Sequence, residues 1–171
     1  MSLPSLKIAP PSFSPLNPAV GIAFYPKLGV LQLHRIEVDA RVAQLVLSIL
    51  VQRPEIESLQ ISSCEVRGEG MTLLAAILLC RSSLSGVTFF QCDLDKAASA
   101  VFARVFCGLQ VEAVTLIRNE IDLKDLGRIA SSLADNQVLR ILYVDQPEIP
   151  REPWADAIRE NISVREAHIA E

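Results

Sequence analysis

Cysteine and histidine are the residues of this sequence best suited to nucleophilic, redox or metal-binding chemistry. The four cysteines form no CxxC pair, and no histidine lies at metal-ligand spacing from any of them. Free cysteine is often buried, and thiols stay reduced in a reducing compartment. We therefore expect four reduced thiols, no metal site and no cofactor. The cysteines are Cys64, Cys80, Cys92 and Cys107.

Two other short patterns could carry chemistry, but neither has the required spacing. The stretch GEG at 68–70 lacks the pattern of a phosphate-binding loop and is expected only to open a helix. Asp93 and Asp95 lie in a predicted turn with no third ligand for a cation nearby. No pattern indicates catalysis, so we expect a protein that is not an enzyme.

The composition of the 171 residues is typical of one globular domain. The chain is 50% hydrophobic and 21% charged, with a formal net charge of −4. Its Lys and Arg residues are scattered, whereas nucleic acids and anionic membranes require a focused basic surface, so we expect neither as a partner. The apolar runs VAQLVLSILVQ and MTLLAAILLC have about half the length of a membrane-spanning helix. The N-terminus lacks the pattern of a secretory signal, and we expect a cytoplasmic protein.

A strand-like pattern recurs five times along the chain. Each copy has apolar residues at relative positions 1, 4, 6 and 11. The copies begin at Leu28, Ile56, Leu84, Val111 and Leu139, so successive starts are 28, 28, 27 and 28 residues apart. A constant internal period of this length indicates stacked repeat units. The copies are LGVLQLHRIEV, IESLQISSCEV, LSGVTFFQCDL, VEAVTLIRNEI and LRILYVDQPEI.

Apolar residues at helical spacing follow the strand pattern. Their i, i+3, i+4, i+7 order predicts a helix that buries one face. A single strand–helix unit cannot cover its own apolar face, so the units must stack to form a continuous core. The predicted core stripes are Ala43, Val46, Leu47 and Leu50; Met71, Leu74, Ala75, Leu78 and Leu79; and Leu126, Ile129, Ala130 and Leu133.

The pattern LxxLxLxx(N/C)xL, followed by a helix, resembles the leucine-rich repeat of the ribonuclease-inhibitor-like class. The resemblance covers residues 28–170. It implies an α/β fold, a leucine-rich-repeat solenoid in the form of a right-handed horseshoe arc, with a parallel β-sheet on the concave side and helices on the convex side. It implies little about chemistry, because this fold serves mainly as a recognition surface.

We expect two parts in the chain. Residues 1–27 form an N-terminal capping segment that contains a degenerate repeat starting at Leu3. Residues 28–171 form the repeat array, whose last, partial unit begins at Val164. That unit stops before its helix, which is the basis for the alternative interpretation that the chain is a fragment of a longer protein.

Side chains of a strand alternate between its two faces, so positions 3, 5 and 7 line the concave surface. Phe89 therefore faces the core and Phe90 the concave side. The resemblance implies that Cys92, at position 9 where the family has Asn or Cys, turns inward so that its polar group meets backbone amides. Ile36 and Pro147 depart from this pattern at their own position 9.

Apolar and aromatic side chains gather at the centre of the predicted concave surface. With strands roughly 4.8 Å apart, Phe90, Ile117 and Tyr143 are near neighbours. Binding energy at interfaces is concentrated in such centres when a polar rim surrounds them, so we expect a binding site here. Alternatively, the patch packs against a missing neighbouring coil, a lid or a second copy. The predicted centre is Phe90, Ile117, Ile141 and Tyr143, and the rim is Gln60, Ser62, Arg118, Asp145 and Gln146.

The register of the units places neither histidine next to a residue with which it could catalyse a reaction. His34 and His168 lie five strand spacings apart, about 24 Å, too far to share a metal or a proton. Cys64 lies one coil from His34 but faces inward, so we expect no Cys–His pair. Cys64 and Cys92 occupy equivalent sites on adjacent coils and are expected to stay reduced. Trp154, the only tryptophan, falls in register with apolar helix positions and is expected in the core.

Together these patterns predict a non-enzymatic protein–protein interaction domain that binds a protein partner through its concave β-face. Three alternatives remain. In the first, the chain is a fragment or regulatory part of a larger receptor, effector or enzyme whose activity lies outside it. In the second, it is an enzyme with a shallow site that includes His34, Ser62 and Cys64. In the third, it associates with itself through the unfinished C-terminal coil, because the sequence does not determine the oligomeric state.

Overall fold

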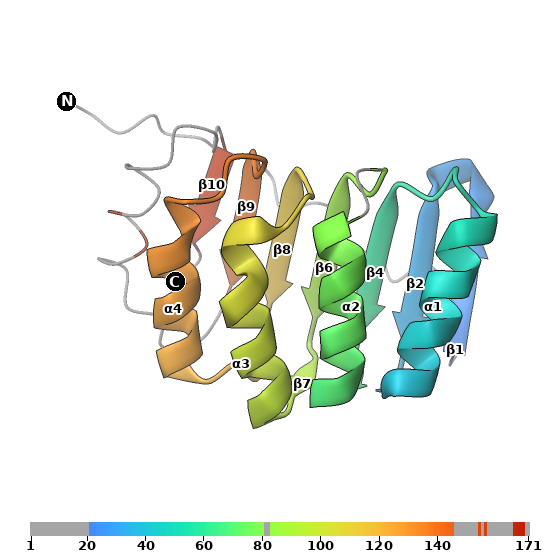
Figure 1. The fold of residues 1–171 in the computed structure, drawn as a ribbon, viewed down its shortest axis with the longest axis horizontal. Helices are drawn as coiled ribbons and strands as arrows, with labels where there is room; N and C mark the ends of the chain where they lie inside the picture. The colour runs from blue at the N-terminus through green and yellow to red at the C-terminus, as the bar shows by residue number, and fades with distance from the viewer. Residues whose placement is uncertain (1–20, 81–82, 146–153, 155, 157–165, 170–171) are drawn as a thin grey trace.

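The computed structural model describes residues 21–80, 83–145, 154, 156 and 166–169. The main sheet consists, in spatial order, of β1 (Gly21–Tyr25), β2 (Val30–His34), β4 (Ser58–Ser62), β6 (Gly86–Phe90), β8 (Ala113–Ile117), β9 (Ile141–Asp145) and β10 (Glu166–Ile169). A smaller sheet consists of β3 (Glu37–Val38), β5 (Glu65–Val66) and β7 (Asp93–Leu94). The helices are α1 (Ala40–Gln52), α2 (Gly68–Cys80), α3 (Lys96–Val105) and α4 (Leu123–Leu133), with 3-10 turns η1 (Pro26–Leu28) and η2 (Phe106–Gly108). The fold is mixed α/β with a mostly parallel sheet, and Figure 1 shows α1–α4 together on one face of it.

The parallel strands of the main sheet pair with a nearly constant offset. Leu31 of β2 lies opposite Leu59 of β4, 28 positions later, and Leu59 lies opposite Val87 of β6 at the same offset. Strands β8 and β9 continue this register through Val114 and Leu142. The predicted alternation of strands and helices is present, and residues about 28 positions apart line up across neighbouring strands of the sheet.

Aspartate side chains cap α1, α3 and α4. Asp39 accepts a hydrogen bond from the backbone N–H of Val42, and Asp95 and Asp122 do the same at α3 and α4. Such caps satisfy N–H groups that have no partner within the helix. An aspartate thus marks the start of each of these helices, directly after β3 for α1 and directly after β7 for α3.

Helix α2 begins at Gly68, as predicted from the GEG stretch. Gly70, in the first turn, lies so close to β3 that an added Cβ would collide with the carbonyl oxygen of Val38. Glycine at this position therefore allows α2 to pack closely against the preceding unit.

The hydrophobic core lies between the main sheet and the helices. The ring centroids of Phe89 and Phe102 are 5.3 Å apart, and those of Phe102 and Phe106 are 5.8 Å apart, both in edge-to-face geometry. Trp154 is fully buried in this core, as predicted. Most of the predicted helix stripes are also buried, namely Ala43, Val46, Leu50, Met71, Leu74, Ala75, Leu78, Leu126, Ile129, Ala130 and Leu133.

The outer side of α1 departs from the predicted pattern. The predicted burial of Leu47 is wrong, because its side chain is 45% exposed and lies one turn from Val51, which is 70% exposed. Leu28, the first residue of the first copy, is also exposed because it lies in turn η1 at the edge of the sheet. In the part of the chain that the structure describes, no helix combines the length and apolar character needed to cross a membrane.

Strand β1 is an element that the sequence patterns did not predict. It pairs antiparallel with β2, so that Ala23 lies opposite Gln32, and it forms one edge of the main sheet. Ile22 and Phe24 pack against the core from this edge. The degenerate repeat predicted from Leu3 lies outside the described residues.

Candidate functional site

The predicted site lies on the face of the main sheet opposite α1–α4 (Figure 1). We call this the helix-free face, because none of the helices described within residues 21–145 covers it. Its side chains alternate with core side chains, as in β4, where Leu59 and Ile61 are buried and Gln60 is half-buried. From β2 to β9 it comprises Val30, Gln32, His34, Ser58, Gln60, Ser62, Gly86, Thr88, Phe90, Ala113, Thr115, Ile117, Ile141, Tyr143 and Asp145.

The side chains of the helix-free face form rows that cross the strands. Phe90 of β6 lies beside Ile117 of β8, and Ile117 lies beside Asp145 of β9. Tyr143 lies beside Thr115, in the adjacent row. The structure therefore places Phe90 and Ile117 on adjacent strands in one row and Tyr143 one row away.

The apolar residues of the predicted centre differ in exposure. Ile141 is 41% exposed and Tyr143 and Phe90 are half-buried, whereas Ile117 is only 6% exposed. Ile141 lies beside Ala113, whose small side chain shields it little. The accessible apolar surface of this face is therefore concentrated at the β9 end.

A charged pair borders the apolar surface at the β9 end. Arg118 Nε lies 3.7 Å from Asp145 Oδ2, and the arginine side chain is largely exposed. Burial and the nearby carboxylate of Asp145 raise the pKa of the Tyr143 hydroxyl, whereas Arg118 acts in the opposite sense. Arg118, Tyr143 and Asp145 therefore form one electrostatically linked group, and Gln146 of the predicted rim lies outside the described residues.

Ser62 of the predicted rim makes a contact that the sequence analysis missed. Its hydroxyl lies 2.9 Å from Nδ1 of His34 on β2 and donates to the carbonyl oxygen of Leu33 at 3.3 Å. His34 is 7% exposed, and its Nε2 has no hydrogen-bond partner among the residues that the structure describes. Both residues occupy position 7 of adjacent units, so the register contained the signal for this contact. Gln60 is half-buried one row away, beside Gln32.

Cys64 and Cys92 turn inward after their strands, as predicted, and so does Asn119 at the equivalent position after β8; all three are buried. The two thiols donate to backbone carbonyls, and that of Cys92 reaches the oxygen of Ile61 at 3.2 Å. Asn119 donates to the carbonyl of Phe89 at 3.0 Å and accepts from the N–H of Cys92 at 3.0 Å. Asn119 therefore makes the contact with a backbone amide that the resemblance implies for Cys92, whereas the two thiols donate to carbonyl groups.

Burial makes the inward thiols poor nucleophiles. It raises the pKa of Cys64 and raises that of Cys92 to about 12, so both stay protonated at neutral pH. His34 contacts Ser62 and not Cys64, and all four cysteines are free. His168 lies on β10, five strands away from His34 in the main sheet. Within the described ranges, no group of three or more His, Cys, Asp or Glu residues could hold a metal ion.

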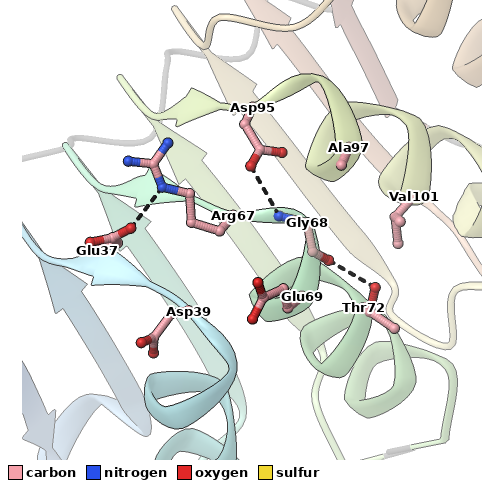
Figure 2. Close-up of a pocket in the computed structure, with 9 residues that line it drawn as sticks. All are labelled: Glu37, Asp39, Arg67, Gly68, Glu69, Thr72, Asp95, Ala97 and Val101. Atoms are coloured by element: carbon pink, nitrogen blue, oxygen red, sulfur yellow. Dashed lines mark hydrogen bonds and ion pairs between the residues drawn. The ribbon is translucent and has the colours of Figure 1, made fainter.

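A polar hollow of about 580 Å³ lies where the smaller sheet leads into the helices (Figure 2). Arg67 spans two strands there, donating from Nε to Glu37 at 2.7 Å and from Nη2 to Glu65 at 2.7 Å. Asp39 and Asp95 are the caps of α1 and α3. Arg67, Glu37, Asp39 and Asp95 thus have structural partners, and we assign no ligand to the hollow. Its lining residues are Glu37, Asp39, Arg67, Gly68, Glu69, Thr72, Asp95, Ala97 and Val101.

Comparison with known proteins assigns neither a family nor a function to this chain. No protein-family model, no curated protein and no solved structure matches the chain. The function is therefore inferred from the residues of the helix-free face themselves.

Proposed function

We propose that the chain is a leucine-rich-repeat solenoid that binds a protein partner through the helix-free face without catalysing a reaction. The observation that carries this proposal is the exposed Ile141 beside the half-buried Tyr143, on a sheet face that no described helix covers. The free energy falls when a partner removes apolar side chains in such a position from water. Parallel strands in nearly constant register support the solenoid, since stacked units bury one continuous core.

The charges and the shape of this face suggest the chemistry of the partner. An apolar or aromatic side chain of the partner would pack on Ile141 and Tyr143 of β9, and a second one would contact Phe90 of β6. Polar groups at the edge of the partner would meet the Arg118–Asp145 pair, which favours specificity more than affinity. The proposal also places the protein in the cytoplasm, because its four free thiols suit a reducing compartment.

A pair of matched charge substitutions tests this function. Ile141→Asp places a carboxylate on the helix-free face, and Leu123→Asp places one at a residue of α4 that is 53% exposed. Each variant and the wild type would be used for quantitative affinity capture from an extract of the native source. Proteins retained by the wild type and by Leu123→Asp, but lost with Ile141→Asp, would support the proposal. The same set of proteins from all three would contradict it.

The contact between His34 and Ser62 favours a second candidate function, acyl transfer with Ser62 as the nucleophile. A serine–histidine pair normally has a third group that orients the histidine, whereas Nε2 of His34 has no partner among the described residues. A fluorophosphonate probe separates the two functions. Labelling of the wild type that Ser62→Ala abolishes would favour an enzyme, and a lack of labelling in both proteins would favour binding alone.

A further inference from the structure

A groove of about 430 Å³ lies between the neighbouring helices α3 and α4, on the helix side of the main sheet (Figure 1). Its lining combines small side chains with two arginines, one from each helix. Both arginines are exposed, so their guanidinium groups meet water at the groove. The lining residues are Ala100, Ala103, Arg104, Arg128 and Ser132.

Two lysines lie along the same groove. Residues four positions apart in a helix lie on one side of it, one turn from each other. Each helix has a series with this spacing that begins with a lysine and continues with residues of the groove lining. Lys96 and Lys124 therefore lie on the groove side of their helices, and both are exposed. The series are Lys96, Ala100 and Arg104 in α3 and Lys124, Arg128 and Ser132 in α4.

The repeat period brings these cations together. Lys96 and Lys124 are 28 positions apart in the sequence, close to the offset of 27 positions at which β6 pairs with β8. Positive charges that are scattered along the chain thus meet on adjacent helices. Among the ion pairs of the described residues, none involves Lys96, Arg104 or Lys124, so these three cations keep their charge available to a ligand.

A buried carboxylate holds Arg128 at the groove. Nη1 of Arg128 donates to Oδ1 of Asp125 at 2.8 Å, and Oδ2 of the same carboxylate accepts from Oγ of Ser99 on α3 at 2.9 Å. Asp125 is 4% exposed, so this link between α3 and α4 is sheltered from water. The Arg128 side chain is 53% exposed, and its other guanidinium nitrogens make no hydrogen bond among those described. They can therefore donate to an anion in the groove.

The charge and the size of the groove indicate the class of ligand. Four cations along one groove require several negative charges at close spacing, and arginine and lysine both bind phosphate oxygens. A volume of about 430 Å³ is typical of small-molecule sites, whereas protein partners cover much larger surfaces. Asp95 and Asp122 cap the two helices, and their carboxylates would repel a long polyanion that continued past the N-terminal end of the groove.

We propose that the groove between α3 and α4 binds a small molecule that carries several phosphate groups, with Arg104 and Arg128 as its main contacts and Lys96 and Lys124 beside them. The site lies on the opposite side of the main sheet from the helix-free face. It therefore does not depend on the proposed binding of a protein partner.

Titration of the ¹⁵N-enriched full chain with inorganic pyrophosphate locates the site. We expect the amide signals of Ala100, Arg104 and Ser132 to shift, and those of Ile141 and Tyr143 on the helix-free face to stay in place. Sodium chloride at matched ionic strength is the control, because it screens charges without bridging two arginines. Equal shifts with sodium chloride, shifts spread over both sides of the sheet, or no shift at all would overturn the proposal.

Two pairs of matched substitutions separate the groove from net charge. Arg104→Gln with Lys124→Gln removes two positive charges from the groove, and Lys27→Gln with Arg41→Gln removes two exposed positive charges elsewhere. We expect the dissociation constant for pyrophosphate to rise at least about fivefold in the groove pair and less than about twofold in the control pair. The urea midpoint of each protein checks that it is folded. Equal weakening in both pairs would overturn the proposal, and so would a short DNA duplex that binds the same residues more tightly than pyrophosphate.

Discussion

Replacing Leu142 and Tyr143 by alanine tests the two faces of β9. The residues are adjacent in sequence, but Leu142 is 1% exposed in the core and Tyr143 is half-buried on the helix-free face. Leu142→Ala removes a buried side chain and leaves a cavity, which we expect to lower the free energy of unfolding by about 2–5 kcal/mol. Tyr143→Ala removes a side chain from the outer face, and we expect a loss of about 1 kcal/mol or less.

Trp154 provides the assay for this comparison, because it is the only tryptophan and is fully buried. Its fluorescence during urea titration reports the unfolding midpoint of each variant, and circular dichroism in parallel tests whether the chain unfolds in one transition. We expect a clearly lower midpoint for Leu142→Ala and a midpoint near the wild type for Tyr143→Ala. An equal loss for the two variants would show that Tyr143 is a core residue, which would refute the assigned faces.

Three further changes have outcomes that follow from the structure. Gly70→Ala forces a Cβ against the carbonyl of Val38, and we expect a loss of about 1–3 kcal/mol in urea unfolding; a neutral effect would contradict the close packing of α2. Asn119→Ala removes the hydrogen bonds of this side chain to two backbone groups and should cost about 2–4 kcal/mol, more than Asn119→Cys, which restores a donor. The reverse order in the same assay would contradict the inward role. Burial raises the pKa of Cys92 from 9.0 to about 12, so the contribution of the buried thiol to stability is complete below pH 9 and is lost as the pH rises toward 12. We expect the melting temperature of Cys92→Ala to fall less steeply over this pH range than that of the wild type. An equally steep fall would contradict the raised pKa.

Elements with a regular local period could be predicted from the sequence. The alternation in LRILYVD predicts an inward Leu142 and an outward Tyr143, and the structure has this arrangement. The stripe of Leu126, Ile129 and Leu133 likewise predicts the buried side of α4. In both elements the same residues that define the period also form the core, so local pattern and tertiary packing agree.

Features that depend on contacts between distant segments could not be predicted in this way. Strand β1 lies outside the five repeat copies and pairs antiparallel with β2, so the repeat pattern does not mark it. The exposure of Leu47 depends on how far the neighbouring helices reach around α1, which no local pattern records. The burial of Gln32 and His34 contradicts their polar character, and the strand alternation that places them on the helix-free face does not predict it.

Photo-crosslinking is the most direct test of the proposed binding face. A photo-reactive residue would replace Tyr143 on β9 and, in a control protein, Arg128, which is exposed on α4 on the opposite side of the sheet. Both proteins would be irradiated in an extract of the native source. We expect one discrete protein adduct from position 143 and no corresponding adduct from position 128. The same adducts from both positions, or none from either, would contradict the claim that the helix-free face recognises a protein partner.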